Sequence, residues 1–337
     1  MAGPVENKGS ITLRNAREVA AAFGVGVAGG YLAGRALRRG MDGRSARVPQ
    51  GTTEERTKRY YNEAQSYLTG QLQGTCHFGY TEVGQPFALG TALHGMEVQL
   101  GQALGLEPGA TVVDAGCGFG RVAKTMASEF GLNVIGVDLV PQRVEEARRF
   151  AQEHGVSDRV SFIEGSYSKL PLKDNSVDAI YTMETLCHAD SLEDTLAEFR
   201  RVLKPGGKLV NVEYTIPPHE SLGRIRRKIT DTMVNNTGMA SIGHFTHGAF
   251  PSIMESAGFE GVDVRDISQN VWPTWHHLFK QALQDNRTKL LPKILHGTLM
   301  DTPNLAGSLM IWPYRRQLRE NIITSTKPNI DSQQGKI

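Results

Sequence analysis

The sequence predicts an α/β fold, a doubly wound seven-stranded sheet with helices on both faces, preceded by a helical segment and interrupted by cap insertions. Two observations lead to this prediction. Short apolar runs, each suited to a buried parallel strand, alternate along the sequence with stretches of helical period. Such strand–helix units call for a parallel sheet, because each crossover helix returns the backbone to the same edge.

The expected elements begin at residue 57. The stretch from Thr57 to Gly105 is expected to be helical, since its apolar residues recur near the spacing of a buried stripe, and Pro108 ends it. Helices are expected before Phe130, from Pro141 to His154 and from Leu192 to Leu203. The expected strands are Thr111–Ala115, Asn133–Val137, Val160–Glu164, Val177–Met183, Lys208–Tyr214, Val262–Ile267 and Ser308–Trp312.

Three parts are expected along the sequence, and the middle one carries insertions. They are a leader and polar linker (1–56, with an apolar segment at 19–34), one domain (57–324) and a disordered tail (325–337). Within the domain, the ligand-binding core spans about 85–265, and the cap insertions are 215–258 and 268–307.

The composition argues against some function classes. Lys and Arg total 37 against 35 Asp and Glu, so the protein lacks the broad positive field that a nucleic-acid binder needs. The three cysteines, Cys76, Cys117 and Cys187, have no zinc-cage spacing. They predict a reducing, intracellular compartment and no disulfides.

The apolar segment of the leader has two interpretations. Residues 19–34 carry almost no charge, and Gly26, Gly30 and Gly34 repeat at the spacing that lets membrane helices approach closely. The segment is nevertheless short for a spanning helix and is not followed by a secretory cleavage site. It is therefore either a flexible leader or a membrane anchor. The expected location is the cytoplasm or an intracellular membrane such as the endoplasmic reticulum.

The strongest functional signal is the segment from Asp114 to Gly120, which follows a predicted strand and precedes a predicted helix. Gly116 and Gly118 can adopt backbone angles closed to other residues, and they let a ligand lie directly on the backbone. Asp138 ends the next predicted strand, where a carboxylate can accept hydrogen bonds from both hydroxyls of a ribose. This Rossmann-like arrangement predicts a nucleoside ligand.

The spacing of the glycines argues against a dinucleotide. A Gly-x-Gly-x-x-Gly loop would place its third glycine at position 121, which is Arg121. Asp114 would repel a diphosphate but can face a cationic amino-acid group. The predicted cofactor is therefore S-adenosyl-L-methionine, bound by Asp114, Gly116, Cys117, Gly118, Gly120 and Asp138.

These features resemble the class I S-adenosylmethionine-dependent methyltransferases over roughly residues 85–265. The glycine loop, the acid after the second strand and the Leu-Lys-Pro-Gly-Gly turn of that family are similar to residues 114–120, Asp138 and residues 203–207. Within the family, the sequence looks most like the sterol C-methyltransferases, which act on the sterol side chain. Residues 184–189 read Glu-Thr-Leu-Cys-His-Ala, which is similar to their Glu-x-x-Cys-His-Ala segment.

The sequence departs from the sterol enzymes at two places. Arg121 follows the glycine loop where those enzymes have another glycine, and Ser166 stands where they have an acid. Ser166 and Tyr167 are expected beside the adenine, with Leu186 or Cys187 also beside the ligand. Further cofactor contacts are expected from Leu139 and Glu184.

A sulfonium carries an activated methyl group, so the protein must mainly hold the acceptor in line and exclude water. Methyl transfer to an alkene creates a carbocation, which aromatic faces can stabilise and a base must then deprotonate. The candidate bases are Glu184, His188 and His77, and His188 is favoured because imidazole accepts a proton near neutral pH. The candidate substrate-binding residues are Tyr61, Phe78, Tyr80, Tyr214, Trp272 and Trp275.

Each of these assignments has a structural alternative. Glu184 and His188 could be a hydrogen-bonded pair that only supports the fold, and the aromatic residues could belong to the core. The pairs His244 with His247 and His276 with His277 lack the further ligands that a metal needs, so no metal is expected.

Three functions stay open. The first is C-methylation of a lipophilic sterol or other isoprenoid-type acceptor. The second is O- or N-methylation of a small secondary metabolite, which needs a base but no cation-stabilising wall. The third is a catalytically silent scaffold that binds S-adenosylmethionine. The expected partner is a lipophilic small molecule, while membrane contact through the N-terminal segment and the oligomeric state stay open.

Overall fold

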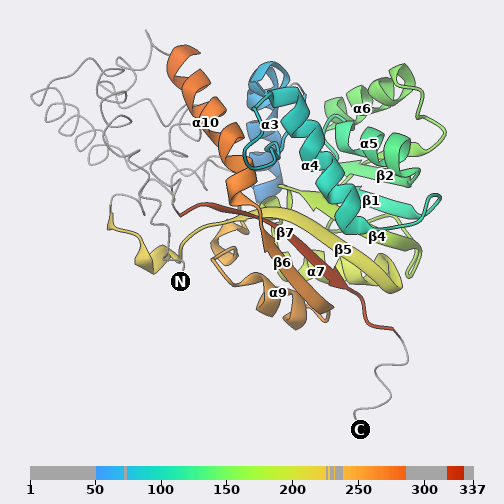
Figure 1. Ribbon diagram of the computed structural model, residues 1–337. Helices are drawn as coiled ribbons and strands as arrows, with labels where there is room; N and C mark the ends of the chain where they lie inside the picture. Colours follow the sequence, from blue (N-terminus) through green and yellow to red (C-terminus); the bar gives the residue numbers. More distant parts are fainter. Residues whose placement is uncertain are drawn as a thin grey trace, which may run out of the picture.

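The protein is described by a computed structural model, which covers residues 51–71, 74–224, 238–285 and 317–329, together with Arg227 and Asp231. Its centre is a seven-stranded sheet with the order β3-β2-β1-β4-β5-β7-β6 (Figure 1). Neighbouring strands pair in parallel except at β7, which is antiparallel to both β5 and β6. The strands are β1 (Thr111–Ala115), β2 (Asn133–Asp138), β3 (Val160–Glu164), β4 (Val177–Met183), β5 (Leu203–Thr215), β6 (Glu260–Asp266) and β7 (Arg319–Thr326).

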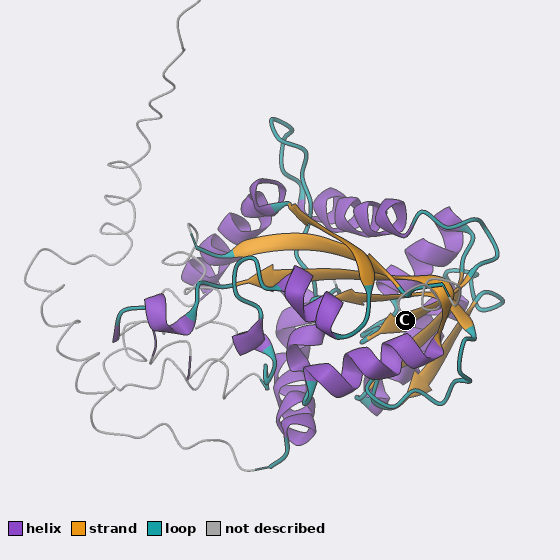
Figure 2. Cartoon of the chain, turned by 90° about the horizontal axis from the view of Figure 1, so that it is seen from below, coloured by secondary structure: helices purple, strands orange, loops and turns teal. Residues whose placement is uncertain are grey.

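Helices cover both faces of the sheet (Figures 1 and 2). Successive side chains of a strand point to opposite faces, so Val112 and Val113 of β1 contribute to two different hydrophobic cores. One core lies beneath α4, α5, α6 and α10, and the other beneath α7 and α9. The helices are α3 (Thr53–Gln71), α4 (Leu89–Leu104), α5 (Arg121–Phe130), α6 (Pro141–Glu153), α7 (Leu192–Val202), α9 (Phe250–Ser256) and α10 (Ser268–Asp285), with short 3-10 helices η1 (Leu186–His188), η2 (His219–Ser221) and η3 (Ile242–His244).

The predicted fold class is confirmed, and the first four strands lie within one residue of their predicted bounds. The fifth begins earlier than expected. Leu203 already pairs with Val177, and an irregularity then shifts the register before Ala179 pairs with Lys208. The expected turn at residues 203–207 is therefore an irregular start of β5.

The expectation of one helical stretch from Thr57 to Gly105 is wrong. Residues 74–88 leave the helix and separate α3 from α4. Gly79 lies against α4 so closely that a Cβ atom would stand 2.7 Å from the Ala92 backbone, and its carbonyl accepts a hydrogen bond from Thr274 on α10. This segment is held between two helices, which sequence periodicity does not reveal.

The antiparallel strand β7 lies at Arg319–Thr326, whereas the closing strand expected at Ser308–Trp312 falls outside the described residues. Ile322 and Ile323 of β7 enter the two opposite cores, which fixes the strand in the sheet. Its last two residues extend into the stretch expected to be a disordered tail.

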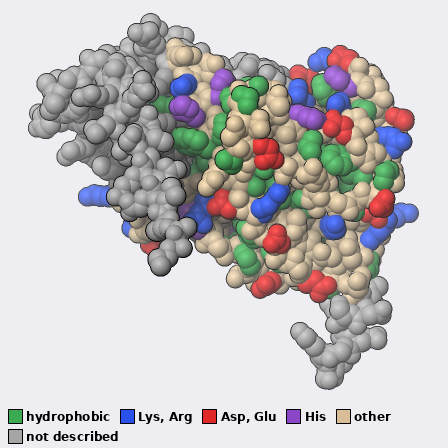
Figure 3. Space-filling model, viewed as in Figure 1, with side chains coloured by type: hydrophobic (Ala, Val, Ile, Leu, Met, Phe, Trp, Pro, Cys, Tyr) green, Lys and Arg blue, Asp and Glu red, His purple; other side chains and the backbone are tan. Residues whose placement is uncertain are grey.

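The apolar segment 19–34 also falls outside the described residues. None of the helices in the described ranges combines the length and the apolar character that a membrane span requires. On the face seen in Figure 3, acidic and basic side chains are interspersed, and the visible described surface carries no broad basic area.

Candidate active site

The site lies at the carboxyl edge of the sheet, where the strand order reverses between β1 and β4. The loops after these strands meet the segment that precedes α4, and a small cavity lies between them. We call it the glycine-loop cavity. Its lining includes the predicted residues His77, Asp114, Gly116, Cys117 and Gly118, and also Cys76, Phe119 and Arg121, which were not predicted.

The glycine loop requires the absence of side chains at two positions. Gly116 has φ of +93°, and a Cβ atom there would lie 2.6 Å from the Thr185 methyl group. Gly120 has φ of +77°, and its Cβ would lie 2.9 Å from the Phe162 ring. Glycine is therefore required at these two positions because Thr185, which follows β4, and Phe162 of β3 pack directly against the loop.

Asp114, the last residue but one of β1, has an unsatisfied carboxyl oxygen. Its side chain is buried, and Oδ2 has no hydrogen-bond partner among the described residues. Burial raises the pKa of Asp114 to about 7; the Tyr181 hydroxyl beside it works to lower that pKa, and the nearby Asp138 charge adds to the effect of burial. A buried carboxylate oxygen without a partner is destabilising, and a cationic ligand would relieve this. Asp114 is thus suited to an ammonium group.

Asp138 ends β2, and backbone groups fix its carboxylate. Oδ2 accepts a hydrogen bond from the Gly118 N–H and Oδ1 from the Val140 N–H, both at 2.9 Å. Burial raises the pKa of Asp138. Each oxygen can accept a further hydrogen bond, so the carboxylate can still receive ribose hydroxyls. Leu139, which follows it, is half-buried.

The residues expected beside an adenine have local partners. The Tyr167 hydroxyl donates to the Thr185 carbonyl at 2.8 Å, and the Ser166 hydroxyl accepts from the Ser168 N–H at 3.2 Å. Tyr167 therefore fastens the turn after β4, a role that sequence reasoning did not assign to it.

Glu184 follows β4 in a strained conformation. Its φ of +56° is uncommon for a residue other than glycine, and Oε1 accepts a hydrogen bond from the Phe78 N–H at 2.6 Å. Burial raises the pKa of Glu184 well above its ordinary value, with the Glu213 charge adding to the effect. A raised pKa favours the protonated form of the carboxyl group. That form can donate a hydrogen bond, whereas the role of base that the sequence suggested needs the ionised form.

Two further carboxyl groups, Glu213 and Glu320, were missed. Glu213 Oε1 accepts hydrogen bonds from the N–H groups of Thr185 at 2.9 Å and Leu186 at 2.6 Å, so it holds the turn that carries Glu184. Glu320 of β7 is fully buried, and neither of its oxygens has a partner among the described residues. Glu213 lies near the carboxyl end of the apolar strand β5, which was a signal that could have found it. Glu320 is the second residue of β7, a strand that the sequence did not indicate, and the antiparallel course of β7 brings it to the same edge of the sheet.

Glu213→Gln is expected to reduce the loss of stability with rising pH. Burial raises the pKa of Glu213 from 4.5 to about 8. Between these values the folded state holds a proton that the unfolded state has released. The resulting stabilisation is complete below pH 4.5 and is lost as the pH rises through 8, by about 1.4 kcal/mol per unit. Glutamine does not titrate and keeps an oxygen for Thr185 and Leu186.

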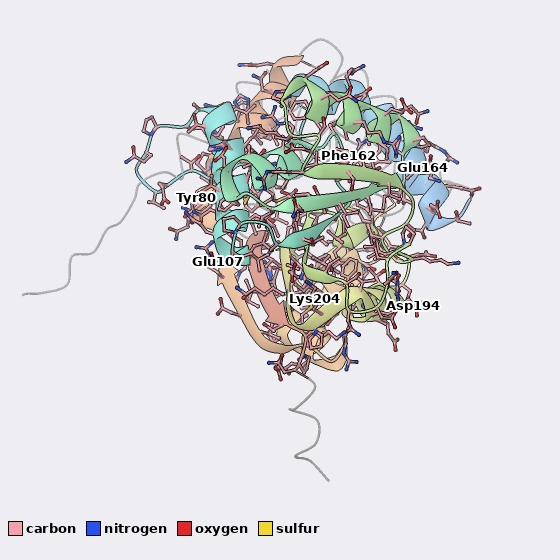
Figure 4. The ribbon with its side chains drawn as sticks, turned by 90° about the vertical axis from the view of Figure 1, so that its right-hand side faces the viewer. Tyr80, Glu107, Phe162, Glu164, Asp194 and Lys204 are labelled. Carbon is pink, nitrogen blue, oxygen red and sulfur yellow. The ribbon has the colours of Figure 1, made fainter. Side chains whose placement is uncertain are left out.

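The measurement is the free energy of unfolding in urea across this pH range. Its decline should be shallower in Glu213→Gln than in the wild type. Glu107→Gln is the control, because Glu107 lies exposed in the loop before β1 (Figure 4). An unchanged decline in Glu213→Gln would mean that the folded state holds Glu213 ionised.

His188 and Tyr61 form a hydrogen-bonded pair. His188 Nδ1 lies 3.3 Å from the Gly238 carbonyl, which can only accept, so this nitrogen carries the proton in the neutral ring. Nε2 is then the acceptor, and the Tyr61 hydroxyl donates to it at 2.9 Å. Burial lowers the pKa of His188 to about 4. The imidazole is therefore neutral at physiological pH, and its Nε2 lone pair faces the Tyr61 hydroxyl.

His77 lies beside the carboxylate of Glu97. Its Nδ1 lies 2.9 Å from the Phe78 carbonyl, and its Nε2 lies 3.6 Å from Glu97 of α4. Burial works to raise the pKa of Glu97, but His77 and Thr125 outweigh it and lower that pKa. His77 thus lines the cavity beside an ionised partner, in contrast to His188.

The predicted aromatic residues fall into separate places. The rings of Phe78 and Trp275 meet edge to face with centroids 5.9 Å apart, and the Phe78 backbone N–H binds Glu184. The Tyr214 hydroxyl donates towards Cys187 Sγ at 3.4 Å. Trp272 lines an open pocket of about 400 Å³ between α10 and residues 81–85, where Trp275 is also part of the wall. Tyr80 (Figure 4) is half-buried, and the next residue, Thr81, lines this pocket. Of the predicted aromatic residues, Tyr61 binds the candidate base His188 through its hydroxyl, and Phe78 binds Glu184 through its backbone N–H. Among the described residues, no cluster of His, Cys, Asp and Glu could hold a metal ion.

Comparison with known proteins identifies the family. A family model described as a methyltransferase domain matches residues 113–211. An S-adenosyl-L-methionine-dependent Diels-Alderase of Talaromyces variabilis is 36% identical over 235 residues, which cover 66% of this protein and 80% of that one. The protein belongs to the S-adenosylmethionine-dependent methyltransferase family.

Other members of this methyltransferase family are similar too. A sterol 24-C-methyltransferase of Gibberella zeae is 33% identical over 213 residues, which cover 63% of this protein and 55% of that enzyme. The crystal structure of the cyclase SpnF matches with a TM-score of 0.67 and 22% identity, over 83% of this protein and 98% of that one. The likeness to SpnF concerns the fold.

The described residues of this methyltransferase fit S-adenosyl-L-methionine, the cofactor of the family. The unpartnered Oδ2 of Asp114 suits the ammonium group of the methionine part, and Gly116 and Gly118 line the glycine-loop cavity without side chains. Asp138 is fixed where it can accept the ribose hydroxyls. When bound, the cofactor supplies an activated methyl group, and the protein's own residues must position the acceptor and handle the proton.

Proposed function

We propose that this protein transfers a methyl group from S-adenosyl-L-methionine to a carbon atom of a lipophilic, isoprenoid-type acceptor. The observation that carries this proposal is the Tyr61–His188 hydrogen bond, which places a neutral imidazole behind a phenol. The pair lies close to the glycine loop, because the guanidinium group of Arg143 stacks on the Tyr61 ring at 4.2 Å and also approaches Gly118.

The pair can remove the proton that C-methylation leaves behind. Methylation of an alkene forms a carbon–carbon bond and leaves a cation on the neighbouring carbon. The Tyr61 oxygen takes a proton from an adjacent carbon while its own proton passes to His188 Nε2. The electron pair of the broken C–H bond forms the new double bond and neutralises the cation. His188 ends as an imidazolium, whose Nδ1–H still donates to the Gly238 carbonyl.

Aromatic side chains can stabilise the carbocation that methylation of an alkene forms. The rings of Phe78 and Trp275 meet edge to face, and burial raises the pKa of Glu184, whose carboxyl group accepts a hydrogen bond from the Phe78 N–H. Ring faces attract a cation without adding a nucleophile that could trap it. The sterol 24-C-methyltransferase relative, named for a carbon acceptor, is consistent with this chemistry.

A second candidate is a cofactor-dependent cyclisation without methyl transfer. Two observations favour it: the relative at 36% identity is named a Diels-Alderase, and burial raises the pKa of Glu184 well above its ordinary value, which favours the protonated form that can donate a hydrogen bond. A cycloaddition needs no base, and a hydrogen bond to a carbonyl of the substrate accelerates it. In this case Glu184 and Tyr61 would serve as donors.

One experiment distinguishes these functions. The purified protein is incubated with an extract of apolar metabolites and S-adenosylmethionine carrying a labelled methyl group, and in parallel with S-adenosylhomocysteine. We expect a product with the label on carbon, formed only with the first cofactor. An isomer of unchanged mass would support cyclisation instead. Label on oxygen or nitrogen would support the second methyltransferase class. Cofactor binding without any product would support a silent scaffold.

A further inference from the structure

Arg143 stands where helix physics disfavours it. It is the third residue of α6, and a cation in the first turn opposes the positive end of the helix dipole. The residue is also buried, with only 4% of its surface exposed, although burying a guanidinium group is costly. The place in the first turn of the helix and the burial are both unfavourable for a guanidinium group. Such unfavourable features concentrate at functional sites, so they point to a functional role of Arg143.

The surroundings of Arg143 come from three parts of the protein. Its guanidinium carbon lies 4.2 Å from the centre of the Tyr61 ring on α3 and 4.9 Å from that of Phe119 in the glycine loop. Nη1 donates to Cys76 Sγ at 3.5 Å. Nη2 is buried and has no hydrogen-bond partner among the described residues. One strong donor is therefore unused in the middle of the site.

The unused donor lies next to the cofactor-binding groups. A Cβ atom added to Gly118 would stand 3.8 Å from Arg143 Nη1, so the guanidinium group borders the bare backbone of the loop. The negative charge of Asp138 also acts on Arg143, and the Gly118 N–H binds the Asp138 carboxylate directly. An oxygen-bearing group gripped by Asp138 is thus within the reach of Arg143.

We propose that Arg143 binds the ribose side of S-adenosylmethionine together with Asp138, and that its stacking on Tyr61 couples cofactor binding to the position of α3. Arg143 Nη2 donates to a ribose oxygen, which satisfies the buried donor. The guanidinium group is then fixed against Tyr61, and Tyr61 is held in line with His188. Arg143 is a cofactor-binding residue that also positions the Tyr61–His188 pair.

The inference rests on cofactor binding and not on the nature of the acceptor. Its test therefore uses no acceptor, and a failure here leaves the proposed reaction untouched. The variants are Arg143→Gln, which removes the charge, and Arg143→Lys, which keeps the charge but loses the planar stacking group. Arg149→Gln on the same helix is the matched control, because Arg149 is exposed.

Calorimetry with S-adenosylhomocysteine gives the first readout. We expect Arg143→Gln to weaken binding about tenfold or more and Arg143→Lys to weaken it less, whereas Arg149→Gln binds like the wild type. Equal affinity of Arg143→Gln and the wild type would overturn the assignment to the ribose.

Hydrogen exchange of α3 gives a second readout that a purely structural role would not change. Saturating S-adenosylhomocysteine should slow exchange in α3 of the wild type but not in α3 of Arg143→Gln. The same slowing in both proteins would overturn the coupling.

If Arg143→Gln does not fold, the cofactor affinities of Tyr61→Leu and Tyr61→Phe test the proposal instead. Leucine removes the stacked ring and should weaken cofactor binding, whereas phenylalanine keeps the ring and should not. Equal affinities of these two variants would overturn the proposal.

Discussion

Asp114→Asn is expected to weaken the binding of S-adenosylmethionine and S-adenosylhomocysteine by about two orders of magnitude. Both molecules carry an ammonium group, and Asp114 Oδ2 is a buried acceptor without another partner among the described residues. Breaking one side of a buried charged pair costs roughly 3–5 kcal/mol, and each 1.4 kcal/mol is tenfold in affinity. Asparagine keeps the shape but loses the charge.

The pH dependence of cofactor binding provides a sharper test of the same residue. The ammonium group needs the ionised carboxylate, and the pKa of Asp114 in the free protein is about 7. Below that pH a proton competes with the ligand, so affinity should fall about tenfold per unit of pH. In Asp114→Asn this dependence should disappear. Asp158→Asn, at an exposed position before β3, is the control and should bind like the wild type. Wild-type affinity in Asp114→Asn would refute the assignment.

His188→Ala should lower kcat by about a hundredfold to ten-thousandfold while cofactor affinity stays within twofold. A positioned general base contributes a factor of this size, and the imidazole is the group in the Tyr61 pair that can store the proton. Because burial lowers the pKa of His188 to about 4, the ring is already neutral at pH 6, and its titration should not limit the rate above pH 5.

Turnover of the labelled cofactor, with affinity from calorimetry, measures this effect. Tyr61→Phe should also lower kcat, because the phenol oxygen is the atom that receives the proton from the substrate. His154→Ala is the matched control, since His154 is exposed at the end of α6. If the cofactor affinity of His188→Ala falls while kcat is unchanged, His188 has a structural role and is not the base. Full turnover in both variants would leave Glu184 and the cyclisation candidate to be tested.

The fold and the cofactor loop could be predicted because they depend on local patterns. Buried parallel strands appear as short apolar runs, and the glycine loop has a fixed place between a strand and a helix. Asp114 and Asp138 were found because each lies at the end of a strand next to that loop. Their environments were also foreseeable in part, since acids at the carboxyl edge of buried strands lose solvent.

The rest depends on contacts between distant segments. The Tyr61–His188 hydrogen bond joins residues 127 positions apart, and no spacing rule indicates such a pair. Arg143 looks like an ordinary solvent-facing residue of a charged helix until Tyr61 and Phe119 enclose it. Glu184 was predicted as a site residue, but its raised pKa follows from burial beside Glu213, which only the folded structure brings about.

The placement of β7 also bears on how the molecule is made. Among the described strands β7 comes last in the sequence, yet it lies between β5 and β6, and it is the only described strand that pairs with β6. The parallel part of the sheet is complete in the sequence by residue 215, whereas β6 gains this partner only when residues 319–326 have been synthesised. Glu320 lies on β7. The cofactor loop can thus form during synthesis before Glu320 joins Glu213 near Glu184.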